Sequence, residues 1–253
     1  MARGDGVVLR VQDGTSMFTY YSDFTDRWPG AAYVESVLLI IMMTTAIIGN
    51  ILVIVSVTRY RKMRTVTNYF VLSLAISDLL FATHVPIIII TRITVDWVIG
   101  DIPCKLVDYM MFVSAINSIL TLMVISIDRR IVICVSSRNR MTRRRGAQWI
   151  AATWLVSIVF SVPIALTHMV HHVYQDDTIY VFCHIVWPDW FNGLWYLAPF
   201  AICFFFLPLG VMVYSYVKVF QTVKKSHARL AAIGGKQNRK VALEGRKHRA
   251  SED

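Results

Sequence analysis

One long apolar stretch, residues 104–134, limits what this chain can fold into. It has the sequence CKLVDYMMFVSAINSILTLMVISIDRRIVIC. As a helix rising about 1.5 Å per residue, it is longer than the roughly 20 residues needed to cross a bilayer. Cys104 stands at one end, and Asp128, Arg129 and Arg130 stand near the other. Charges at the edge of an apolar span are costly unless they reach water or face protein, so these three are candidate functional residues.

Other runs of similar length indicate a membrane protein. The chain is 56% hydrophobic and only 17% charged, which is too apolar for one soluble core of this size. Each run is too long for a strand of a barrel. The sequence therefore predicts an all-α membrane bundle of five transmembrane helices, with spans at residues 34–57, 69–90, 102–135, 149–166 and 194–219.

The basic residues orient this bundle. Of the 26 Lys and Arg, four follow the first span, seven lie between Arg129 and Arg145, and ten lie from Lys218 onward. Positive residues collect on the cytoplasmic side, so the amino terminus is predicted outside and the carboxyl terminus in the cytoplasm. This topology accounts for the net charge of +10 without a nucleic-acid partner. Inner-leaflet lipid headgroups remain an alternative partner for the basic tail.

Three segments follow from this topology. Residues 1–33 are polar and aromatic, and no apolar signal-peptide core precedes the first span, so we expect an extracellular segment. Residues 34–224 form the predicted transmembrane bundle. Residues 225–253 form a basic cytoplasmic tail.

Polar side chains at membrane depth need partners. Asn50 in the first span and Asp78 in the second are candidates to meet each other, and Ser114, Ser118 and Thr121 form a polar stripe on the third. A carboxylate in the membrane is either a cation ligand or a protonated hydrogen-bond donor. The alternative for Asp78 is a structural hydrogen bond to Asn50 without an ion.

The outer side carries cysteines and histidines. By this topology, Cys104 and Cys183 fall there, where a disulfide can persist. His168, His171 and His172 follow the fourth span with the spacing by which a helix could present a metal. Because no fixed fourth ligand is present, zinc binding is the less favoured interpretation.

Taken in order, these features resemble the rhodopsin-like G-protein-coupled receptors. The resemblance covers nearly all of residues 34–224 and implies five helices of a seven-helix receptor fold. It also implies a receptor and not an enzyme. The matching residues are Gly49-Asn50, LSLAISD ending in Asp78, Trp97 before Cys104, SIDR ending in Arg129, Trp154, Cys183, and Pro208 with Tyr216.

Carried over by position, the resemblance implies a switch at the inner end of the third span. Arg129 would meet a heterotrimeric G protein, and Asp128 would hold it at rest. Tyr216 would become its partner on activation. The family's Asp-Arg-Tyr triplet ends in Arg130 here, which adds a charge at the coupling surface.

The resemblance also implies roles elsewhere in the bundle. Cys104 and Cys183 would form a disulfide that ties the second outer loop to the third helix. Asp78 and Ser118 would belong, with Asn50, to a polar core that holds an allosteric sodium ion; no other cofactor is implied. Trp154 and Pro208 would be structural residues.

The ligand expected from the resemblance is an extracellular neuropeptide. Aminergic receptors of this family have an aspartate where this chain has Met111, because a buried ammonium needs a counter-ion. DRRIVICVSSRNRMTRRRG and SVPIALTHMVHH look most like galanin and allatostatin-A receptors. Met111, Trp97 and His168 are the candidate ligand-facing residues. The outer acids would suit a basic or amidated peptide, or are ordinary solvated loop charges; they are Asp96, Asp101, Asp176, Asp177 and Asp189.

Other classes have weaker support. No H-E-x-x-H or G-x-S-x-G sequence indicates an intramembrane enzyme, and no internal repeat indicates a transporter. Since the sixth and seventh spans of the family are missing, we expect a fragment, a truncated isoform or an incomplete gene model of a plasma-membrane receptor. A short isoform that retains full-length receptors without signalling is the alternative function.

Overall fold

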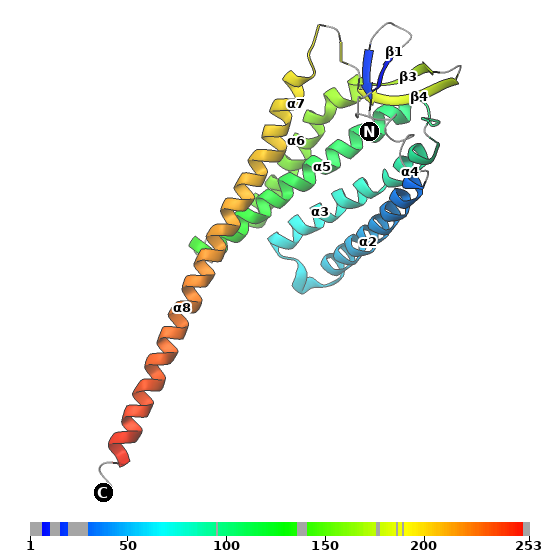
Figure 1. Cartoon of the computed structure of the whole chain (residues 1–253). Helices are drawn as coiled ribbons and strands as arrows, with labels where there is room; N and C mark the ends of the chain where they lie inside the picture. Colours follow the sequence, from blue (N-terminus) through cyan, green and yellow to red (C-terminus); the bar gives the residue numbers. More distant parts are fainter. Residues whose placement is uncertain are drawn as a thin grey trace, which may run out of the picture.

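Long helices lie side by side, with two strand hairpins at one end of the bundle (Figure 1). The computed structural model describes residues 7–10, 16–19, 30–94, 96–135, 141–175, 178–185, 187–188 and 190–249. Within these residues, five helical stretches are long and apolar enough to cross a membrane. They are Ala32–Arg59, Val66–Thr94, Asp101–Val135, Arg143–Thr167 and Leu194–Ala228. The predicted five-span membrane bundle is confirmed.

The first two helices pack as an antiparallel pair. Helix α2 covers Ala31–Arg59 and α3 covers Val66–Ala82, with a short 3-10 turn, Arg61–Met63, between them. The Thr65 hydroxyl caps α3 by accepting a hydrogen bond from the Asn68 backbone N–H at 3.3 Å. Helix α2 extends past the predicted span at both ends, and α3 begins before residue 69, because hydropathy marks only the apolar part of each helix.

The second span is broken near its proline. Helix α3 ends at Ala82, and α4 covers Val85–Thr94. Pro86 has no backbone N–H to donate, so a regular helix cannot pass through it unchanged. The kink redirects the outer half of the span toward the hairpins (Figure 1).

Helix α5, Asp101–Arg130, is the central element. It packs against α3, α6 and α8 and ends in a π-helical turn, Ile131–Val135. Its buried side chains include polar ones, such as Ser114, Asn117 and Thr121, which lie on its packed side. An apolar cluster of Ile116, Leu120 and Phe204 closes the contact with the fifth span.

The fourth span is one helix, and the fifth is a run of three helical segments. Helix α6 covers Arg143–Thr167. The fifth span contains α7, Leu194–Ala201, a π-helical segment, Ile202–Phe206, and α8, Leu207–Arg249. The π segment ends two residues before Pro208, whose missing N–H favours a wider turn in the preceding residues. Helix α8 continues beyond the bundle (Figure 1), so the described part of the predicted basic tail is helical.

Two antiparallel hairpins add strands to the predicted all-helical bundle. Strands β1, Val7–Arg10, and β2, Ser16–Thr19, form the first, which is the described part of the predicted extracellular segment before Gly30. Strands β3, His168–Gln175, and β4, Thr178–Ile185, form the second. The β3–β4 segment is rich in β-branched and aromatic residues, which favour strands. A search for apolar runs of bilayer length does not detect such short elements.

Candidate functional site

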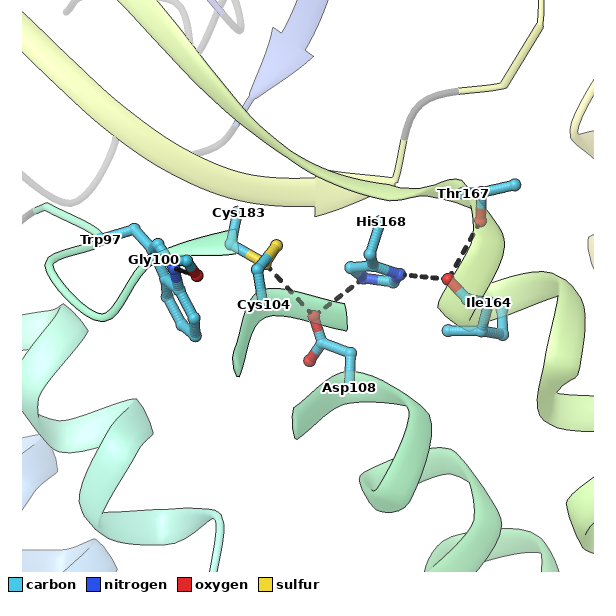
Figure 2. Close-up of a disulfide and its surroundings, with 8 residues drawn as sticks. All are labelled: Trp97, Gly100, Cys104, Asp108, Ile164, Thr167, His168 and Cys183. Atoms are coloured by element: carbon cyan, nitrogen blue, oxygen red, sulfur yellow. Dashed lines mark hydrogen bonds and ion pairs between the residues drawn. A yellow bond between two sulfur atoms is a disulfide. The ribbon is translucent and has the colours of Figure 1, made fainter. Parts of the chain in front are cut away.

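A disulfide joins the second hairpin to the central helix. Cys104, in the first turn of α5, is bonded to Cys183 on β4, with 5.7 Å between their Cα atoms (Figure 2). The predicted pairing is confirmed. The sulfur atoms join positions 79 residues apart, so the hairpin is held over the outer end of α5. Cys134 and Cys203 are free.

The loop before Cys104 is fixed to the same hairpin. The Trp97 backbone N–H donates to the Val181 carbonyl at 2.7 Å, and Asp96 accepts from the Val181 N–H at 2.6 Å. The Trp97 indole N–H donates to the Gly100 carbonyl at 2.8 Å. Gly100 has φ +90°, a conformation that glycine adopts without strain. Trp97 is therefore buried in the loop.

His168 and Asp108 form an ion pair beside the disulfide. His168 Nε2 lies 2.8 Å from Asp108 Oδ2, and Nδ1 lies 2.7 Å from the Ile164 carbonyl oxygen (Figure 2). Burial lowers the pKa of His168, but hydrogen bonds to Asp108 and Ile164 and the negative charge of Asp108 outweigh it, so the pKa lies above its ordinary value. Cys183 Sγ lies 3.8 Å from the same Asp108 oxygen.

A small pocket opens between these elements. It has a volume of about 240 Å³, and Asp108, Trp97 and Cys183 are in its wall. Arg92 of α4 also lines it and pairs with Glu35 of α2 at 3.0 Å. We call it the outer pocket; the remaining lining residues are Ile87, Ile88, Thr91 and Val107.

A polar layer connects α3 to α5 at mid-membrane. The Ser118 hydroxyl donates to Asp78 Oδ1 at 2.9 Å, and Asn117 Nδ2 donates to Ser77 Oγ at 2.5 Å. Asn117 Oδ1 is buried without a hydrogen-bond partner. Carboxylate, hydroxyl and amide oxygens are ligands that hard cations prefer, so these residues fit the sodium ion implied by the family resemblance.

Asn50 does not take part in this layer as expected. Its side-chain amide donates to the Ala46 carbonyl within α2 at 2.9 Å. The prediction of a hydrogen bond between Asn50 and Asp78 is therefore wrong for this structure. A backbone carbonyl one turn away satisfies the amide without a second helix.

The inner end of α5 separates three neighbouring charges. Asp128 is buried and accepts a hydrogen bond from the Thr67 hydroxyl at 3.0 Å. Arg129 is exposed, and the Arg130 guanidinium lies over the Tyr214 ring, 5.4 Å from its centre. Successive residues of a helix point in different directions. The expected contact between Asp128 and Arg129 is absent from the described residues for that reason.

A model of the 7-transmembrane receptors of the rhodopsin family matches residues 49–250. The chain belongs to the rhodopsin family of seven-transmembrane receptors. Two relatives agree with this. A QRFP-like peptide receptor of Branchiostoma floridae is 30% identical over 196 residues, 76% of this chain and 52% of the relative. A cholecystokinin receptor of Xenopus laevis is 32% identical over 189 residues, 73% of this chain and 42% of the relative. The chain spans about half the length of these relatives.

For a rhodopsin-family receptor, the three candidate ligand-facing residues have different positions. Trp97 lines the outer pocket. His168 is not in the pocket wall, but it contacts Asp108, which is. Met111 is half-buried, one helical turn below Asp108 on α5. The outer acids Asp176, Asp177 and Asp189 lie outside the described residues.

Two further predictions concern the receptor's other candidate residues. Tyr216 is 51% exposed and has no contact with Arg129 among the described residues, so its role on activation stays a prediction. The proposed zinc spacing of the three histidines required a helix, but they lie on β3, where residues three apart face opposite sides. The described residues hold no cluster of three metal-binding side chains.

Asp108 is the residue that sequence reasoning missed in this receptor. The signal was present: an acid one turn after Cys104, inside an apolar run, with a histidine directly after the fourth span. Only the fold shows that Asp108 and His168 meet, because 60 residues of chain separate them.

Proposed function

We propose that this chain is part of a plasma-membrane receptor that binds an extracellular peptide and passes the signal to a heterotrimeric G protein. The course of α5 is the observation that carries this proposal. Asp108 lines the outer pocket, and Arg129 is exposed 21 residues further along the same helix, a separation of about 30 Å. One continuous helix joins the outer pocket at one end to an exposed guanidinium at the other.

A peptide is the ligand class that the outer end supports best. Both relatives carry names of peptide receptors, the QRFP-like peptide receptor and the cholecystokinin receptor. The β3–β4 hairpin gives the outer end a broad surface, and Met111 offers no counter-ion for a small amine. The finer resemblance to galanin and allatostatin-A receptors stays a prediction.

Arg129 is the residue proposed to meet the G protein. A guanidinium keeps its charge at any physiological pH and binds carboxylates and carbonyls in a fixed geometry. Arg129 is exposed, whereas the neighbouring Asp128 accepts a hydrogen bond from Thr67. Arg130 and the basic residues of α8 add positive charge on the same side, which supports a cytoplasmic inner end.

A sodium ion between α3 and α5 is a further part of this proposal. Asp78 and Ser118 supply two oxygens 2.9 Å apart, and Asn117 Oδ1 supplies an orphaned one nearby on α5. When bound, the cation would neutralise the Asp78 carboxylate. These residues would hold α3 against α5 and stabilise the resting arrangement.

The test is signalling by the complete protein that contains this chain. Cells that express it are exposed to a library of amidated peptides, and calcium and cyclic-AMP responses are recorded. We expect a response that Arg129→Ala abolishes while peptide binding is kept. Arg61→Ala, at another exposed basic position on the inner side, is the matched control and should signal normally. No response to any peptide, or full signalling by Arg129→Ala, would contradict the proposal.

The alternative is a short, non-signalling partner that retains full-length receptors. No contact among the described residues favours it. Coexpression of this chain with a full-length receptor tests it, and an unchanged amount of receptor at the cell surface would remove it.

A further inference from the structure

The ring of His168 lies between two oxygen acceptors. Nδ1 faces the Ile164 carbonyl at 2.7 Å, and Nε2 faces Asp108 Oδ2 at 2.8 Å (Figure 2). A neutral imidazole carries one N–H and can donate to only one of them, so its other nitrogen would direct a lone pair at an oxygen. The geometry fits the imidazolium form, in which both nitrogens donate.

The pair is also shielded from water. Only 5% of the His168 side chain and 25% of the Asp108 side chain are exposed. Buried charges are stable together but costly when one partner is lost, because the other remains uncompensated. Loss of the proton leaves one N–H for two acceptors, so the charge attraction is lost and either Asp108 or the Ile164 carbonyl then faces a lone pair.

Several other charged or titratable residues lie on the elements around the His168 ring. Arg92, on α4, pairs with Glu35. On α5, Asp101 and Lys105 are exposed. Strand β1, which packs on β3, carries Arg10, and β4 carries His184 opposite Met169. Among the described side chains, Asp108 is the charged one that contacts the ring.

The His168–Asp108 pair lies where the second hairpin meets the central helix. His168 is the first residue of β3, directly after α6, and Asp108 belongs to α5. Asp108 also lines the outer pocket, next to the Cys183 sulfur. The contact thus fastens the start of the hairpin to the central helix at the rim of the pocket, on the side away from Trp97 (Figure 2).

We propose that His168 and Asp108 form a proton-operated clasp on the outer pocket. The clasp is closed while the imidazole carries its second proton. When that proton passes to water, the ring loses its charge attraction to Asp108 and one of its two hydrogen bonds, so the start of β3 is held less firmly to α5. Its role in ligand binding rests on the proposed receptor function, but the clasp itself does not.

The direction of the pH dependence follows from the raised pKa of His168. The folded protein binds this proton more tightly than the unfolded chain, whose histidine titrates near about pH 6.5. The stabilisation is therefore complete below that pH and is lost as pH rises through the higher folded value. The folded protein should be most stable on the acid side.

Thermal unfolding of the 253-residue chain tests the clasp. The chain, in phosphatidylcholine nanodiscs, is followed by circular dichroism from about pH 5.5 to about pH 8.5, where histidines titrate. We expect Tm of the unmodified chain to fall by about 3 °C or more over this range. His168→Gln should have a lower, flat profile. His172→Gln changes an exposed histidine of the same strand and should leave the slope unchanged.

Asp108→Asn separates the clasp from a merely structural contact. An amide N–H can donate to the lone pair of a neutral imidazole, so this variant should lose the fall of Tm with rising pH. If His168→Gln does not fold, Asp108→Asn and NMR titration of the His168 ring supply the answer. A slope that persists in Asp108→Asn, or a ring that titrates below about pH 6.5, would overturn the clasp. No ligand is used, so failure of the receptor proposal would not affect these results.

Discussion

The indole N–H of Trp154 on α6 donates a hydrogen bond to the Ser73 hydroxyl on α3, with 3.0 Å between the two atoms. The residues are 81 positions apart in the chain. Both also line an apolar groove of about 540 Å³ between the two helices. This hydrogen bond therefore links α3 directly to α6 beside the groove.

Loss of this hydrogen bond should lower the stability of the bundle. Trp154→Phe keeps an aromatic ring but removes the donor, and we expect a loss of about 1 kcal/mol, typical for one hydrogen bond. Chemical unfolding in detergent micelles measures it. Trp149→Phe, at a 49% exposed position of the same helix, should have a much smaller effect. Equal losses in the two variants would show that the bond contributes nothing specific.

Removal of the disulfide should have a larger effect. Cys104→Ser or Cys183→Ser removes a crosslink between positions 79 residues apart. Such crosslinks contribute about 2 to 4 kcal/mol to the free energy of unfolding. We expect little of either variant at the cell surface, measured by antibody labelling of an amino-terminal tag. Cys203→Ser changes an exposed free cysteine and should resemble the unmodified chain. Normal surface labelling of the first two variants would contradict a stabilising role.

Sodium should raise the thermal stability of the bundle if Asp78 and Ser118 bind it. A ligand that binds only the folded state raises stability with its concentration. We expect a higher Tm in sodium chloride than in choline chloride of equal ionic strength, and no difference for Asp78→Asn. Asp101→Asn, at the exposed first residue of α5, should keep the sodium response. A response retained by Asp78→Asn would exclude this carboxylate as the ligand.

Arg130 and Tyr214 should be energetically coupled. The guanidinium lies 5.4 Å from the ring centre, and cation–π contacts contribute about 0.5 to 2 kcal/mol. In a double-mutant cycle of Arg130→Ala and Tyr214→Leu, we expect a coupling energy of about 0.5 kcal/mol or more. Chemical unfolding measures each variant. Losses that simply add would mean that the ring and the cation do not interact.

Much of the fold was predictable because its causes are local. A run of apolar residues of bilayer length must form a helix whether or not its neighbours are known, since lipid offers no partner for backbone groups. The break at Pro86 follows from its missing N–H. The short strands β3 and β4 were not predicted, because they lie outside any apolar run of bilayer length.

The candidate site was predictable only in part. Cys104, Cys183, Asp78 and Ser118 were singled out by residue type and order, and the fold brings each pair together. Asp108 was missed, because an acid in a membrane-facing run does not indicate its partner.

The sequence alone determined that lipid surrounds the helices, how many spans there are and which polar residues lie within them. The tertiary structure decided which of these polar groups meet: Asp128 with Thr67 and not with Arg129, Asn50 with its own helix, and Asp108 with His168. Hydropathy acts on each residue separately, whereas the direction of a side chain depends on how its helix is rotated against its neighbours. That rotation is set by the packing of the whole bundle.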